Sequence, residues 1–235
     1  MRIYFLHHSA VCVELGGTLL IFDNFMHDPD KHMQDGYIGE EEIASYERVY
    51  FFVSHSHFDH FSPRIFDLAK SHVKYILDDT VPREGVPEGT VYMHSGDEYD
   101  DGCLFVREFA STDIGGSFYI RCQGTSLFHA GDLNDWHWKD EGNERYSRVM
   151  THLFTRELAY IRKHVAHIDV AFFPVDKRMG TDYDSGAKAF IETMEPDVLI
   201  PIHFQSFEDT DEFCKKMTGK KTKVIPVHHK GERLI

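Results

Sequence analysis

Four side chains of the kinds that bind metal ions fall within six residues of this sequence. The segment 54–60 reads SHSHFDH, so imidazoles and a carboxylate stand at His55, His57, Asp59 and His60. Zinc and similar first-row divalent ions prefer these nitrogen and oxygen ligands. A tight turn can direct alternate residues at one point and adjacent residues at a second, which suits two neighbouring ions. The segment therefore predicts a metal centre.

A histidine-rich surface loop would have the same composition, and the residues before the cluster decide against it. The apolar run Val49–Val53 is typical of a strand buried on both faces, and it leads directly into the cluster. After the cluster, Ser62 and Pro63 are a helix cap and a proline at the first helical position. The ligand-type groups are thus expected at the mouth of the core, between a strand and a helix.

The rest of the chain is expected to alternate strands and helices in one α/β domain over residues 1–235. Turn residues and apolar patterns predict strands at Arg2–Leu6, Ala10–Leu15, Thr18–Phe22, Arg48–Val53, Val73–Leu77, Thr90–His94, Cys103–Phe109, Ser117–Cys122, Ser126–His129, Ile168–Val175, Val198–Ile202 and Lys223–Val227. Helices are predicted at Pro63–Ser71, Glu144–His164, Asp182–Met194 and Asp209–Met217. Two strand-rich stretches, each followed by helices, favour two packed sheets with helices outside.

The cluster resembles the signature of the metallo-β-lactamase superfamily. Four other fragments follow the order seen in its ascorbate-lactonase-like branch: HSA at 8–10, LIFD at 20–23, AGD at 130–132 and IPIH at 200–203. Each fragment alone would be weak, but together with the histidine cluster they are specific for the superfamily. The resemblance implies a four-layered αβ/βα sandwich with metal ions at the shared edge of the two sheets.

The resemblance also implies a set of ligands. His55 and His57 would serve a first ion, Asp59, His60 and His203 a second, and Asp132 would bridge them. The superfamily usually supplies a third histidine after a mid-chain strand, but residues 110–113 read ASTD. Asp113 could substitute, a water could fill the gap, or only the second site could be tightly occupied. Our hypothesis is one firmly held ion and a weaker second, with zinc, manganese, iron or nickel all compatible with the donors.

A divalent ion lowers the pKa of bound water to about 7, so such a centre predicts hydrolysis. Asp59 and Asp132 are the candidate catalytic groups, because either can orient the water or carry a proton to the leaving group. Substrate-contacting or ligand-supporting roles are considered for His8, Asp23, Asn134, Trp136, Asp176, Lys177 and Arg178. Trp136 and Trp138 could stack on a substrate or pack under the next helix. Lys177 and Arg178 could attract an anion or be ordinary surface charges.

Composition excludes some other classes of protein. With 25 Lys and Arg against 39 Asp and Glu, the formal charge is −14, which disfavours nucleic acid as a partner. The four cysteines form no close pair, so neither a disulfide framework nor a thiolate zinc site is expected. No signal peptide or membrane span is predicted, so the cytoplasm is the expected location. The oligomeric state is left open.

The sequence therefore predicts a metal-dependent hydrolase acting on a small, anionic ester, lactone or phosphoester. An alternative is a non-catalytic metal-binding or ligand-sensing protein of the same fold, motivated by the absent third histidine. A redox enzyme with a di-iron centre is a third interpretation, although nothing in the sequence resembles an attached flavin domain. β-Lactam hydrolysis is not implied, because one fold carries many chemistries.

Overall fold

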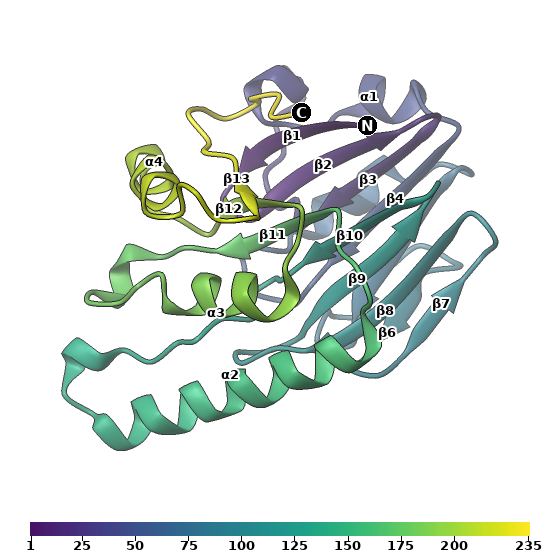
Figure 1. The fold of residues 1–235 in the computed structure, drawn as a ribbon. Helices are drawn as coiled ribbons and strands as arrows, with labels where there is room; N and C mark the ends of the chain where they lie inside the picture. Colours follow the sequence, from purple (N-terminus) through teal and green to yellow (C-terminus); the bar gives the residue numbers. More distant parts are fainter. The chain divides into compact units, whose positions relative to one another are not determined.

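A six-stranded and a seven-stranded sheet carry most of the chain in the computed structural model, which describes residues 1–235 (Figure 1). Each sheet belongs to its own unit. Unit 1 comprises residues 1–94 with 228–235, and unit 2 comprises residues 95–227. None of the helices is both long enough and apolar enough to cross a bilayer.

Unit 1 is built around the sheet β1-β2-β3-β4-β5-β6. Its strands are β1 (Arg2–His7), β2 (Ala10–Leu15), β3 (Thr18–Phe22), β4 (Arg48–Val53), β5 (Val73–Asp78) and β6 (Val91–Met93). The first three are antiparallel, and β3 to β6 run parallel. Helix α1 (Glu40–Ala44) and two 3₁₀ helices (Met33–Asp35 and Pro63–Leu68) lie in the connections. Because β3 and β4 are parallel, their carboxyl ends meet at one edge of the sheet.

The residues after 227 return to unit 1 and pair with the outer edge of β1. The amide of Phe5 donates to the carbonyl of Glu232 (3.0 Å), and the amide of Gly231 donates to the carbonyl of Phe5 (2.8 Å). Tyr4 and Arg233 form an antiparallel bridge. Both chain termini therefore lie at the same strand, as Figure 1 shows.

Unit 2 is built around the sheet β13-β12-β11-β10-β9-β8-β7. Its strands are β7 (Glu98–Asp100), β8 (Leu104–Ala110), β9 (Gly116–Cys122), β10 (Thr125–His129), β11 (Val170–Pro174), β12 (Val198–Ile202) and β13 (Lys223–Val224). Strands β7 to β10 are antiparallel, and β10 to β13 are parallel. Helices α2 (Glu144–His164), α3 (Ser185–Met194) and α4 (Phe207–Lys216) accompany two 3₁₀ helices (Lys139–Glu141 and Lys177–Met179).

Helix α2 buries one face against the core of unit 2. Asn143 caps the helix by accepting a hydrogen bond from the amide of Tyr146 (3.0 Å). The buried positions Met150, Phe154, Leu158 and Ile161 recur every three or four residues, as one face of a helix requires. Figure 1 shows α2 and α3 lying along the sheet of this unit.

Most predicted elements are present, and the mixed α/β class with two sheets is confirmed. The predicted strands Ala10–Leu15 and Thr18–Phe22 match the structure and form a hairpin that turns at Gly16 and Gly17. The bounds of the long helix also match. The helix predicted at Pro63–Ser71 is wrong in type and length. Ser62 does cap Arg64 (3.4 Å), but a 3₁₀ helix ends at Leu68 because Ala69 is already extended toward β5. Neither α1 nor β7 was predicted; their three to five residues are too short for a periodic pattern.

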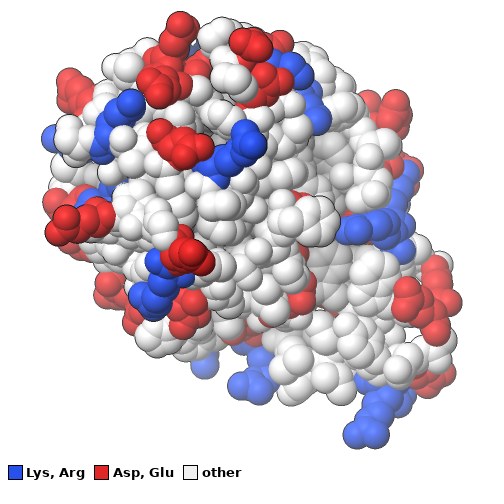
Figure 2. Space-filling model, turned by 180° about the vertical axis from the view of Figure 1, so that it is seen from behind, with Lys and Arg blue, Asp and Glu red and all other residues white.

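Acidic and basic side chains are mixed on the surface. On the face in Figure 2, lysine and arginine side chains stand singly or in small groups among aspartate and glutamate side chains. This face therefore presents no continuous basic surface to a phosphate backbone, in keeping with the formal charge of −14.

A carboxylate at the start of β11 is hydrogen-bonded to β10. Asp169 accepts hydrogen bonds from the amide (2.7 Å) and hydroxyl (2.6 Å) of Ser126. Partial burial alone would raise the pKa of Asp169, but these hydrogen bonds hold the pKa below its ordinary value. The ionised form therefore stabilises the fold above about pH 4, and this contribution is lost as pH falls through the lower folded pKa.

We predict that Asp169→Asn is less stable than wild type at neutral pH and that the difference shrinks as the pH falls below about 4. Urea-unfolding midpoints at pH 7, 5 and 3 measure it. Asp197→Asn is the matched control, because this neighbouring carboxylate is exposed and makes the same charge change. A stability difference that stays constant over this pH range would contradict the prediction.

Candidate metal centre

The histidine cluster occupies a closed turn that follows β4. The carbonyl of His57 accepts hydrogen bonds from the amides of His60 (3.0 Å) and Phe61 (2.9 Å), which closes the turn. His55 and His60 are fully buried, whereas His57 is exposed. The Nε2 of His55 lies 2.9 Å from the Nδ1 of His57. The turn therefore buries two of the imidazoles and leaves the third exposed.

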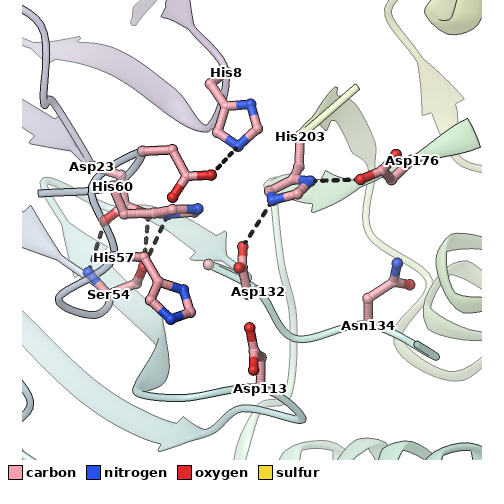
Figure 3. Close-up of polar contacts among 12 residues, drawn as sticks. His8, Asp23, Ser54, His57, His60, Asp113, Asp132, Asn134, Asp176 and His203 are labelled. Atoms are coloured by element: carbon pink, nitrogen blue, oxygen red, sulfur yellow. Dashed lines mark hydrogen bonds and ion pairs between the residues drawn. The ribbon is translucent and has the colours of Figure 1, made fainter. Parts of the chain in front are cut away.

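Asp23 fixes the base of this turn from the end of β3. Its carboxylate accepts hydrogen bonds from the amide and hydroxyl of Ser54 (both 2.7 Å) and contacts the Nδ1 of His60 at 2.7 Å (Figure 3). Asp23 is 1% exposed and has a left-handed backbone (φ 45°). Because Nδ1 faces Asp23, Nε2 is the nitrogen that His60 can offer to a metal ion. This carboxylate–histidine arrangement is common behind metal-ligating imidazoles.

His8 pairs with Asp59 on the other side of the same turn. The Nε2 of His8 lies 3.4 Å from Asp59 Oδ2, and the ligand-type atoms of His8, Asp59 and His60 lie within 4.8 Å of one another. The hydrogen bond with His8 holds the pKa of Asp59 well below its usual range. Asp59 is thus kept ionised, as both a metal ligand and an acceptor of protons must be.

Unit 2 brings together Asp132 and His203, which are far apart in the sequence. His203 follows β12, Asp132 follows β10, and His203 Nε2 lies 3.5 Å from Asp132 Oδ1 (Figure 3). The Nδ1 of His203 contacts Asp176 Oδ2 at 3.1 Å. Asp176 is fully buried, which by itself would raise its pKa, but hydrogen bonds with His203 and Arg178 lower that pKa to about 2. The arrangement of His203 and Asp176 therefore repeats that of His60 and Asp23.

Trp136 supports Asp132 from within the core. Its indole nitrogen donates to the carbonyl of Asp132 (2.7 Å), and its ring packs edge-on against His203 at a centroid distance of 5.5 Å. Trp136 is 7% exposed and stacks on Trp138. Of the two interpretations left open for Trp136, the structure favours packing, since little of the ring is accessible to a substrate.

Asp113 and Asn134 lie on two loops that are joined by hydrogen bonds. The hydroxyl of Thr112 donates to the carbonyl of Asn134 (2.5 Å) and accepts from its amide (3.0 Å). Figure 3 shows the carboxylate of Asp113 directed toward Asp132. The Asn134 side chain instead packs against Gly186 of α3, where an added Cβ would lie 1.9 Å from its Oδ1, so its role is to hold the loop.

Lys177 and Arg178 are committed to neighbouring carboxylates. Lys177 pairs with Glu212 (2.5 Å) and Asp209 (3.2 Å), and the Arg178 guanidinium contacts Asp176. Arg178 thus supports the carboxylate that holds His203. Neither cation offers an uncommitted charge for an anionic substrate.

Ser54 is the contributor that sequence reasoning missed. Its amide and hydroxyl supply two of the donors that compensate the buried charge of Asp23. Its hydroxyl also lies 3.0 Å from the Nδ1 of His55. Its position in the sequence could have indicated this role, because Ser54 is the single polar residue between the apolar strand and the first histidine.

The chain is similar in sequence and in fold to proteins named as metal-dependent hydrolases. No protein-family model matches the chain. The UPF0173 metal-dependent hydrolase of Pyrobaculum arsenaticum is 24% identical over 256 residues, an alignment that covers 100% of this chain and 99% of that protein. Igni18, a metallo hydrolase of the archaeon Ignicoccus hospitalis, superposes with a TM-score of 0.69 at 18% identity, covering 99% of this chain and 97% of that one. The metallo-β-lactamase fold protein YhfI of Bacillus subtilis gives a TM-score of 0.58 at 10% identity and 96% coverage of both chains.

The chain therefore has the metallo-β-lactamase fold that the predicted resemblance implied. Within it, the chain is similar to UPF0173 metal-dependent hydrolases along its whole length. These likenesses support a metal-dependent hydrolase of the metallo-β-lactamase type. The ascorbate-lactonase-like branch, the metal's identity and the substrate class stay predictions.

Asp23→Asn should loosen the histidine turn. The side-chain NH2 of the new asparagine would face at least one of the donors on Ser54 and His60, so that donor would lose its acceptor. A buried donor without an acceptor costs about 1–3 kcal/mol. We expect a loss of unfolding free energy in this range, measured by urea denaturation. Asp79→Asn, at an exposed position after β5, is the matched control and should change stability by less than about 0.5 kcal/mol. Equal stability of the two variants would contradict the assigned role of Asp23.

Proposed function

We propose that this chain is a metal-dependent hydrolase whose imidazole and carboxylate side chains hold one or two divalent ions. The proposed ligands are His55, His57, Asp59 and His60 of unit 1, and Asp132 and His203 of unit 2. In this proposal Asp132 bridges the two ion positions. His55 and His57 serve one position, and Asp59, His60 and His203 serve the other.

The observation that carries this proposal is the presence of one histidine–carboxylate pair in each unit. His60 is held by Asp23, and His203 by Asp176, in both cases through Nδ1 and a buried carboxylate. Such a carboxylate fixes the ring orientation and increases the basicity of the other nitrogen, as it does for ligating histidines generally. The donor set of imidazoles and carboxylates therefore fits a divalent first-row ion.

A divalent cation bound there would lower the pKa of water to about 7 and so supply hydroxide at neutral pH. The chain's own contribution is to hold carboxylates in their ionised form beside it. His8 keeps Asp59 ionised. The indole nitrogen of Trp136 holds the backbone carbonyl of Asp132, and the Nε2 of His203 contacts the carboxylate of Asp132. Asp59 and Asp132 can then orient the water and carry a proton to the leaving group.

The proposed substrate is a small ester, lactone or phosphoester, because all three are cleaved by attack of hydroxide on an electrophilic centre. The expected negative charge of the substrate came from the lactonase-like resemblance and from Lys177 and Arg178 as candidate contacts. Both cations are committed to neighbouring carboxylates, so the proposal specifies the bond cleaved and not the charge.

We expect hydrolysis of at least one member of a panel of lactones, carboxylic esters and phosphodiesters, lost with EDTA and restored by zinc or manganese. His57→Ala and Asp132→Ala should each lose well over about 100-fold in kcat/KM, because removing even a residue behind a ligand costs about 10–100-fold. His152→Ala, an exposed histidine of α2, is the matched control. Metal binding without turnover of any substrate would favour a non-catalytic protein of this fold.

We further propose that the two ion positions differ in affinity. Three side chains and the bridge serve one position, whereas His55, His57 and the bridge serve the other. Asp113, whose carboxylate is directed toward Asp132 in Figure 3, is the candidate to complete the weaker position. A carboxylate donor there would take the place of the superfamily's usual third histidine.

Replacing this carboxylate should therefore change metal occupancy. Asp113→Ala should release the weaker ion during dialysis, whereas Asp113→His should retain close to two ions per chain, because imidazole is a strong ligand for these metals. Metal content per chain by mass spectrometry provides the measurement. Ile114→His, which adds an imidazole one residue further along, is the control. Two tightly held ions in both wild type and Asp113→Ala would refute the unequal affinities.

A further inference from the structure

One aromatic side chain stands exposed among the proposed ligands. Phe58, between His57 and Asp59, is 85% exposed, the largest value among the exposed large hydrophobic residues. Four of the others lie on α2, and one is the N-terminal methionine. The remaining one is Ile114, 37% exposed, directly after Asp113. The two exposed large hydrophobic side chains outside α2 and the N-terminus therefore each adjoin a proposed ligand in the sequence.

Phe58 lies in the closed turn that carries the ligands. The two hydrogen bonds to the carbonyl of His57 close the turn around residues 57–61 and leave Phe58 at its tip. The aromatic neighbour Phe61 packs against the core of unit 1, where it contacts the ring of Phe66. Phe58 is thus held in water while a phenylalanine three residues away is partly buried.

Free energy falls when another apolar group covers a phenyl ring and removes it from water. A polar side chain at the tip would satisfy the turn equally well, since the hydrogen bonds that close it use only backbone atoms. The cations considered for binding a charged substrate are paired with carboxylates. Phe58 therefore offers a substrate an apolar contact in the turn that carries the proposed ligands.

We propose that Phe58 is a specificity-determining residue that contacts an alkyl or aryl group of the substrate. This inference rests on the proposed function and names its substrate class: an ester, lactone or phosphoester with an apolar substituent near the cleaved bond. Ile114 offers a second apolar side chain of the same kind beside Asp113.

Binding of two metal-chelating hydroxamates to the zinc-loaded protein tests the inference without turnover. Acetohydroxamate reports the metal alone, and octanohydroxamate adds an alkyl chain. Isothermal titration calorimetry should show wild type binding octanohydroxamate at least roughly tenfold more tightly, the equivalent of burying about two methylene groups. Phe58→Ala should lose most of this preference with unchanged acetohydroxamate affinity and zinc content. Phe58→Leu should keep the preference.

Tyr146→Ala removes an exposed aromatic ring of α2 and should leave both affinities unchanged. In hydrolysis of p-nitrophenyl octanoate, Phe58→Ala should raise KM with little change in kcat, whereas p-nitrophenyl acetate should be cleaved as by wild type.

Equal weakening of both hydroxamates by Phe58→Ala would overturn the inference, because Phe58 would then act by shaping the ligand turn. Acetohydroxamate binding without a preference for the longer chain would overturn it and leave the proposed function intact. Failure of both hydroxamates to bind would reject the proposed function as well.

Discussion

A buried carboxylate must be surrounded by hydrogen-bond donors, and this requirement organises the ligand-type histidines of each unit. Asp23 and Asp176 are 1% and 0% exposed, and an ionised group so placed is costly unless donors compensate its charge. Ser54 and His60 supply the donors for Asp23, and His203 and Arg178 supply them for Asp176. The orientation of each ligand-type histidine therefore follows from the electrostatics of the carboxylate behind it. The imidazoles are held in place by the protein's own polar groups.

The backbone is strained at residues in and beside these histidine–carboxylate pairs. His8, Asp23 and His203 have positive φ angles of 46°, 45° and 56°. Residues other than glycine rarely adopt this left-handed backbone region. All three follow directly on a strand or, for His8, separate two strands of a hairpin. A chain that ends a buried strand must turn within one or two residues to keep its next side chain at the sheet edge. Strain of this kind concentrates at functional sites, where the surrounding structure compensates for it.

Sequence reasoning was most accurate where one local signal decides the outcome. The hairpin at Gly16 and Gly17, the long helix with its single buried face and the strand before the histidines all follow from periodicity or turn chemistry. Ligand candidates were identified because metal binding requires particular donor types. The role of Ser54 and the packing of Asn134 against Gly186 depend on contacts between distant segments, which no local pattern records. The commitment of Lys177 to Glu212, 35 residues away, was hidden for the same reason.

The pairing of residues 228–235 with β1 makes unit 1 discontinuous along the chain. During synthesis, the outer edge of β1 has no partner from this segment until residues 231 to 235 have left the ribosome, by which time all of unit 2 has been made. An open strand edge invites pairing with other chains, so the growing polypeptide carries an aggregation hazard throughout its elongation. Residues 228–235 therefore cover the edge of β1 only after unit 2 has been made, and this strand leads directly to His8.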